Sequence, residues 1–300
     1  NKDRIWFAGL IIIAANAGGA WSPIGDVTTT MLWMGKKVTT FQLIKLLILP
    51  SFVCMVIPTL IASFLKPFKS TFDAPESNTN ENSKGPLMLY LGLSLIVFVP
   101  IFKTVTHLPP YIGMMLSLSI VTLVAELISY RQFSMAKLSG DTQTGHSASP
   151  VFRALSKIEM PSILFFLGIL MTVAGLESLG IIFNFGKSVQ EAMPINLFIM
   201  LLGVGSAVID NVPLVAASMG MFDVNTLSES GELIYAKDSP IWHFIAYSAG
   251  TGGSMLIIGS AAGVVAMGME KISFFWYLKN IAWLALLGFL AGAGVFLMFT

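Results

Sequence analysis

Two aspartates lie inside long apolar stretches of this chain. Asp26 follows a segment that interrupts an apolar run, and Asp210 stands with Asn211 between two short apolar runs. A charged side chain at membrane depth costs about 2.5–3.5 kcal/mol on insertion scales, so such residues usually face a pathway or a water-filled cavity. A carboxylate can hold a proton or a small cation, but not both at once. The chemistry predicted here is therefore exchange of a cation for a proton.

Both aspartates also have a structural interpretation. Asp26 follows Pro23 and could cap the half-helix that comes after it, because Asp is a favoured N-cap residue. Asp210 and Asn211 precede Pro213, a residue suited to a first helical turn, and could cap the next half-helix in the same way. Capping and ion binding are compatible, so both interpretations stay open.

Further oxygen atoms lie near these carboxylates and near a second glycine-rich segment. The side chains that could supply them are Asn16, Ser22, Thr28, Thr29, Ser248, Thr251 and Ser254. Carboxylate, carbonyl and hydroxyl oxygens are the ligands of small hard cations. No lysine or arginine lies within either glycine-rich segment, which disfavours an anionic substrate. We expect Na⁺ to be bound through Asp26 and Asp210.

The composition is that of a polytopic membrane protein. Of 300 residues, 55% are hydrophobic and only 11% are charged, against about a quarter charged in soluble domains. The net charge of +1 offers no basic surface for nucleic acid. Because the chain is so apolar, membrane lipid is its expected surrounding partner. One cysteine excludes an internal disulfide, and three scattered histidines lack metal-ligand spacing. We expect an all-α fold, one integral membrane domain over 1–300, and no cofactor.

The elements that must position the aspartates follow from the spacing of apolar runs. We predict a first broken helix over 5–34, a re-entrant hairpin over 193–222 and a second broken helix over 241–269. Gly18 and Gly19 interrupt the first helix. The remaining predicted features are break glycines Gly252 and Gly253 in the second helix and polar loops at 66–85 and 131–159. A single bent crossing is the alternative to the hairpin. Glu159, at the end of the second loop, could admit protons or could simply be a solvated or capping residue.

The two broken helices are related by an internal repeat. A shift of 234 residues aligns 16–45 with 250–279 without a gap and pairs Gly18 with Gly252, Gly19 with Gly253 and Gly25 with Gly259. Four crossings and one hairpin lie between the copies, so we expect the copies to cross the membrane in opposite directions. Interrupted helices in inverted halves indicate the binding site of a secondary transporter. The same shift places partners of other elements before residue 1, so we expect an N-terminally truncated chain and an upstream hairpin.

Three motifs resemble one known family. Residues 15–33, which read ANAGGAWSPIGDVTTTMLW, together with IDNVPLVAA at 209–217 and AYSAGTGGS at 246–254, closely resemble the signature of NhaD-type sodium/proton antiporters of the ion transporter superfamily. The resemblance implies exchange of Na⁺ or Li⁺ for protons in a multi-pass bacterial inner-membrane protein that works as a homodimer. It places Asn16, Asp26, Thr28, Thr29, Asp210 and Asn211 on functional positions of the family.

Two other functions are alternatives to this one. An arsenite or dicarboxylate permease of the same superfamily shares the architecture, but it should show fewer carboxylates at the breaks. An intramembrane aspartyl protease also needs two buried aspartates, and Ile24-Gly25-Asp26 superficially resembles such a site. The repeat and the oxygen-rich breaks have no role in proteolysis. The sequence therefore favours a transporter rather than an enzyme.

Overall fold

The computed structural model describes the chain except residues 1, 69–84, 139–155, 157–159 and 223–234. Every regular element in this described part is helical: α1 (Lys2–Ala20), α2 (Val27–Met34), α3 (Thr40–Ser63), η1 (Lys66–Phe68), α4 (Gly85–Thr106), α5 (Pro110–Leu138), α7 (Met160–Ser178), α8 (Ile181–Ala192), α9 (Ile195–Gly205), α10 (Asn211–Met221), α11 (Pro240–Gly252), η2 (Gly253–Met255), α12 (Ala261–Glu270), α13 (Phe274–Asn280) and α14 (Ala282–Phe299). The expected all-α class is confirmed.

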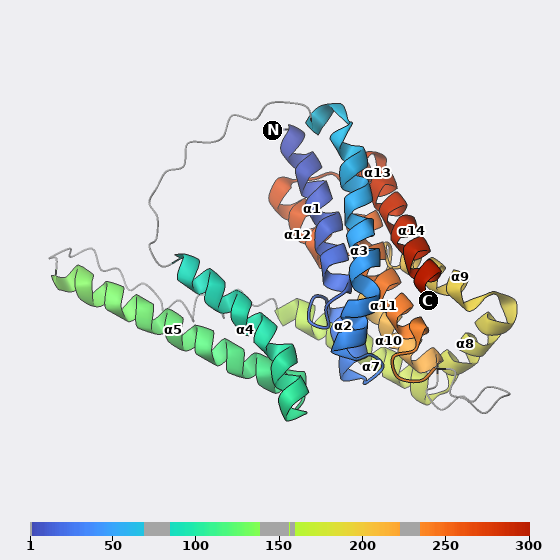
Figure 1. The fold of residues 1–300 in the computed structure, drawn as a ribbon, viewed down its shortest axis with the longest axis horizontal. Helices are drawn as coiled ribbons and strands as arrows, with labels where there is room; N and C mark the ends of the chain where they lie inside the picture. The colour runs from blue at the N-terminus through green and yellow to red at the C-terminus, as the bar shows by residue number, and fades with distance from the viewer. Residues whose placement is uncertain (1, 69–84, 139–155, 157–159, 223–234) are drawn as a thin grey trace. The chain divides into compact units, whose positions relative to one another are not determined.

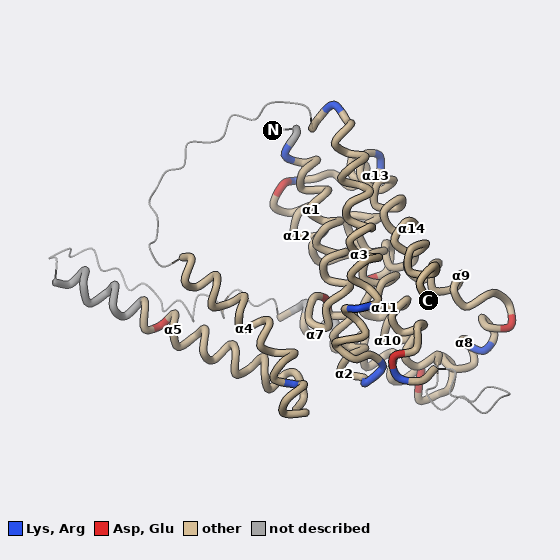
Figure 2. Tube along the Cα trace, in the orientation of Figure 1, with Lys and Arg blue, Asp and Glu red and all other residues tan. Residues whose placement is uncertain are grey.

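Several of these helices are long and apolar enough to cross a membrane. Within the described residues they are Thr40–Ser63, Gly85–Thr106, Pro110–Ile128 and Ala282–Phe299. The pair Leu167–Ser178 and Ile181–Ala192, bent by 74°, adds a fifth if it counts as one span. Figure 2 shows long uncharged stretches along α4, α5 and α14. These helices confirm a polytopic membrane protein.

The chain divides into two compact units, of which Ala74–Phe165 is the smaller. Its helices α4 and α5 pack against each other, with the backbone of Gly113 close to the ring of Phe102. Most of their apolar side chains are exposed, as expected for helices that meet lipid. Helix α5 runs to Leu138 and so includes the first residues of the segment predicted as loop 131–159. Glu159 lies outside the described residues.

The larger unit comprises Asn1–Asp73 and Phe166–Thr300, and α11 lies at its centre. Helices α1, α3, α9 and α14 all pack on α11, and α3 packs along α14 (Figure 1). Every residue of α11 from Ile241 to Gly252 is buried. A helix that is apolar on all sides, as this one is apart from a few hydroxyls and His243, is stable only when it is surrounded.

The two broken helices cross each other in opposite directions. Arg4, at the start of α1, forms an ion pair with Glu270, at the end of α12. Further along, Ala20 lies beside Gly250, where an added Cβ would be 3.2 Å from the Ala20 Cβ. The two broken helices therefore run in opposite directions along their contact. Figure 1 shows α1 beside α12 at one end and α2 near α11 at the other. The copies of the repeat run antiparallel, as an inverted repeat requires.

The breaks are held by matching glycine contacts. A Cβ on Gly25 would lie 2.5 Å from the carbonyl oxygen of Gly19, and a Cβ on Gly259 would lie 2.7 Å from that of Gly253. These are equivalent pairs under the 234-residue shift. Only glycine permits such backbone contact. Two of the glycine identities of the repeat, Gly19 with Gly253 and Gly25 with Gly259, therefore have a common structural cause.

Candidate functional site

The first break brings the Asp26 carboxylate to the N-terminus of α2. Asp26 Oδ1 accepts a hydrogen bond from the backbone N–H of Val27 at 2.8 Å, and Oδ2 accepts one from Thr28 Oγ1 at 2.5 Å. Thr29 Oγ1 accepts from the Asp26 N–H at 3.3 Å and donates to the Asp26 carbonyl. Asp26 is therefore the N-cap of α2, with a capping box formed with Thr29.

The capping interaction leaves the second carboxylate oxygen turned toward another element. Asn211 Nδ2, from the first residue of α10, donates to Asp26 Oδ2 at 3.0 Å. Asn211 is 6% exposed. Asp210 precedes it, half-buried, with its carboxylate near the N–H groups of Asn211 and Val212 but without a capping hydrogen bond. The structure thus brings Asp26, Thr28 and Asn211 together. Asp210 directly precedes Asn211 in the chain.

The N-cap side chain at the second break is a hydroxyl, whereas the N-cap side chain at the first break is a carboxylate. Ser260 is the N-cap of α12, and its Oγ accepts from the N–H of Gly263 at 3.2 Å. Asn16 Nδ2 donates to the same Oγ at 2.9 Å. Asn16 therefore contacts the opposite broken helix rather than Asp26. Sequence reasoning missed Ser260, although the 234-residue shift aligns it with Asp26 and could have identified it.

The remaining predicted oxygen ligands do not join Asp26 through a direct contact in the described structure. Thr251 Oγ1 donates to the Tyr247 carbonyl and Ser254 Oγ to the Thr251 carbonyl, each at 2.6 Å. Ser248 Oγ is buried with no hydrogen-bond partner among the described residues. Ser22 lies in the first break, where its carbonyl accepts from the Gly25 N–H at 3.1 Å. These contacts stabilise the breaks themselves.

The predicted break glycines differ in their surroundings. Gly18 and Gly19 lie in the last turn of α1, and a Cβ on Gly18 would meet nothing within 4 Å. Gly252 lies at the end of α11, where its backbone is pressed against the carbonyl of Gly203 in α9. Gly253 begins η2. Close contact between helix backbones thus explains Gly252, whereas Gly18 has no such requirement.

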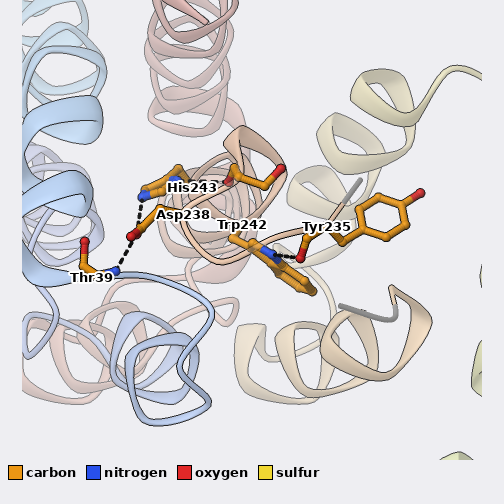
Figure 3. A network of polar contacts seen from close by, with 6 residues as sticks. Thr39, Tyr235, Asp238, Trp242 and His243 are labelled. Atoms are coloured by element: carbon orange, nitrogen blue, oxygen red, sulfur yellow. Dashed lines mark hydrogen bonds and ion pairs between the residues drawn. The ribbon is translucent and has the colours of Figure 1, made fainter. Parts of the chain in front are cut away.

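A second polar cluster joins the start of α11 to the turn before α3 (Figure 3). Asp238 Oδ1 accepts from the Thr39 N–H at 2.6 Å and lies 3.7 Å from His243 Nε2. The Asp238 N–H donates to the Lys37 carbonyl at 2.8 Å, and the Lys37 ammonium lies 4.4 Å from the ring centre of Trp242. This cluster fixes the loop that follows the first broken helix against the helix that begins the second.

Chemically, the Asp26 region is an oxygen-rich site at two half-helix N-termini. No group of three or more histidine, cysteine, aspartate or glutamate side chains among the described residues could hold a metal ion. One carboxylate oxygen of Asp26 instead meets a hydroxyl and an amide, whose own oxygens are also hard-cation ligands. The Asp26 carboxylate is therefore surrounded by oxygen-bearing side chains of the kind that small hard cations prefer.

Comparison with known proteins gives consistent matches. The family model described as "Citrate transporter" (CitMHS) matches residues 1–236. The chain is 42% identical to "Sodium/proton antiporter 1" and 41% identical to "Sodium/proton antiporter 2", both of Arabidopsis thaliana, over 99% of this chain and 49% and 68% of theirs. It is 32% identical to "Na(+)/H(+) antiporter NhaD" of Alkalimonas amylolytica over 96% of this chain and 59% of that protein. The chain spans about half to two thirds of these relatives. No solved structure gives a significant match.

Proposed function

Because this chain belongs to the CitMHS family and to its NhaD-type sodium/proton antiporters, we propose that it exchanges Na⁺ or Li⁺ for protons by competition at Asp26 and Asp210. Its relatives are named as antiporters and transporters, which removes the protease alternative. The observation that carries the proposal is the contact of Asn211 with Asp26 Oδ2. That contact joins the hairpin to the first break at a carboxylate that can hold either ion.

The mechanism follows from the donors around Asp26. While no cation is bound, Thr28 Oγ1 and Asn211 Nδ2 donate to Oδ2 and stabilise the carboxylate. A cation that takes this oxygen must displace those donors, and the hydroxyl and amide oxygens can then turn toward it. A proton on Oδ2 removes the cation site outright. Na⁺ and H⁺ therefore exclude each other, and the exchange needs no cofactor.

Citrate, a tricarboxylate, or a dicarboxylate is the second candidate substrate, and the description of the family model as "Citrate transporter" favours it. The N-termini of α2 and α10 converge on this site, and helix N-termini attract anions. Asp26 already supplies a negative charge at that position, however. A second anion there would meet like-charge repulsion, so cation exchange remains the better proposal.

Proton movement in proteoliposomes tests the two candidates. The full-length protein would receive Na⁺, Li⁺, K⁺ or citrate in turn, with a pH-sensitive dye reporting proton flux. Proton flux that depends on Na⁺ or Li⁺ and is lost in Asp26→Asn and Asp210→Asn supports the proposal. Uptake of labelled citrate by a folded protein that moves no protons with any cation contradicts it.

The proposal also covers the membrane in which the protein lies and its oligomeric state. We place the chain in a bacterial inner membrane as a homodimer, on its resemblance to NhaD proteins, although relatives at 42% identity come from a plant. Fractionation of the native host tests the membrane, and cross-linking in intact membranes tests the dimer. Recovery in another membrane, or only monomers after cross-linking, would contradict these parts without affecting the ion site.

A further inference from the structure

Two contacts between the halves of the inverted repeat involve equivalent positions. The 234-residue shift takes Asn16 to Gly250 and Asp26 to Ser260. Asn16 Nδ2 lies 2.9 Å from Ser260 Oγ, and a Cβ on Gly250 would lie 3.8 Å from Asp26 Oδ2. Each position of one copy thus faces the partner position of the other, as residues do across a two-fold interface.

The equivalent positions have the same backbone but different side chains. The N-cap backbone angles are −144° and 158° at Asp26 and −151° and 152° at Ser260, and both side chains accept from the helix they precede. In the first half, Gly250 brings no side chain to Asp26, whose Oδ2 is contacted by Asn211. In the second half, Asn16 reaches the cap itself. The N-cap of the first break, Asp26, is therefore contacted from α10. The N-cap of the second break, Ser260, is contacted from α1 of the opposite repeat.

The hydrogen-bonding capacity of Ser260 decides what this contact can do. A hydroxyl has one proton to donate and two lone pairs to accept with. The Ser260 Oγ accepts from Gly263 N–H and from Asn16 Nδ2, so both lone pairs are used. No lone pair remains for a cation. Ser260 can thus position neighbouring groups but cannot ligate the ion while these bonds persist.

We propose that Asn16 and Ser260 form an inter-repeat clasp and that Ser260 is a positioning residue for ion exchange. The clasp ties the last turns of α1 to the first turn of α12, and α1 leads directly into the break that ends at Asp26. The same bond orients the Asn16 amide through its nitrogen, so that its oxygen is held in one direction at the end of α1. This inference rests on the proposed function and adds a residue to it.

The test compares apparent KM for Na⁺ with maximal exchange rate in proteoliposomes of the full-length protein. Ser260→Ala should raise the KM about three- to tenfold, the range of a typical hydrogen bond of about 0.5–1.5 kcal/mol, with a smaller change in maximal rate. Ser260→Thr retains the hydroxyl and should restore the KM. The matched control is Ser218→Ala. Ser218 is also buried, but among the described residues its hydroxyl bonds to the Leu214 carbonyl within its own helix, α10.

A double-mutant cycle separates a clasp from two independent effects. Asn16→Ala combined with Ser260→Ala should be no worse than the more severe single variant, because the shared bond is already lost. Effects that multiply would overturn the proposal, as would Ser260→Ala behaving like Ser218→Ala. If the unmodified protein moves no protons with Na⁺, the proposed function fails. The clasp is then judged by the same cycle on thermal unfolding midpoints, where additive shifts would refute it.

Discussion

Asn211 Nδ2 donates a hydrogen bond to Asp26 Oδ2 at 3.0 Å and thereby joins the N-termini of two half-helices that are 185 residues apart in the sequence. Asp26 uses its other oxygen to cap α2. The same carboxylate is thus the N-cap of α2 and the contact point of α10. Substitutions can separate these roles, because some residues keep the cap while losing the charge.

Asp26→Asn is expected to reduce exchange strongly while the protein still folds. Asparagine is as good an N-cap as aspartate, so α2 retains its first turn. The charge that balances Na⁺ is lost, and we expect exchange to fall about tenfold or more, since hydrogen bonds to charged groups contribute about 1.5–3 kcal/mol. Dye-reported proton flux measures the loss. Glu191→Gln, which removes an exposed carboxylate in α8, is the control and should leave the flux unchanged.

Asn211→Ala is expected to raise the apparent KM for Na⁺ by about tenfold, because the amide contact to a charged oxygen is lost at a buried position. Sodium titration of the exchange rate measures this change. Asn196→Ala removes an exposed asparagine from α9 and serves as its control. An unaltered KM in Asn211→Ala would show that the contact seen at Asp26 takes no part in ion binding.

Gly259→Ala should destabilise the second break. The added Cβ would lie 2.6 Å from the carbonyl of Ala207 and 2.7 Å from that of Gly253, and overpacking of this kind costs about 1–3 kcal/mol. A lower thermal unfolding midpoint in detergent would report it. Gly268→Ala, at a position in α12 with nothing within 4 Å, should leave the midpoint equal or slightly higher. Equal midpoints for both variants would mean that the backbone contact is not required.

Asp238→Ala should lower stability by about 1–3 kcal/mol, because it leaves the Thr39 N–H without its carboxylate acceptor. Asp238 also has φ +62°, a conformation that aspartate and asparagine tolerate better than alanine. Asp238→Asn keeps an acceptor oxygen and this backbone preference, so its unfolding midpoint should stay near that of the unmodified protein. Equal losses in both variants would assign the effect to the negative charge instead.

Local chemistry in the sequence indicated where the helices are interrupted, whereas the ion-binding role of the residues beside the breaks stays a prediction. Glycines, proline and a polar residue in an apolar run locate a break, and the antiparallel crossing followed from the repeat. Asp26 and Asn211 could be proposed as neighbours because both follow helix interruptions. Capping by Asp26 was also foreseeable, since it depends on only the next three residues.

Side-chain direction could not be predicted in the same way. Thr251 and Ser254, predicted as additional ion ligands, donate to carbonyls a few residues earlier in the chain. This local bonding leaves their oxygen lone pairs available, so their part in ion binding stays a prediction. The partner of Asn16 depends on how two helices cross, across 244 residues of sequence. Gly252 looked like a helix breaker, whereas the structure shows that it permits α9 to approach α11.

The burial of α11 from Ile241 to Gly252 limits how the larger unit can move. Interiors are packed too densely for a helix to slide past all its neighbours without opening voids. Because every residue from Ile241 to Gly252 is covered, α11 must travel together with the helices that surround it. Under the proposed exchange, opening the Asp26 region to the other side of the membrane therefore requires movement at an outer surface of this packed block, rather than rearrangement within it.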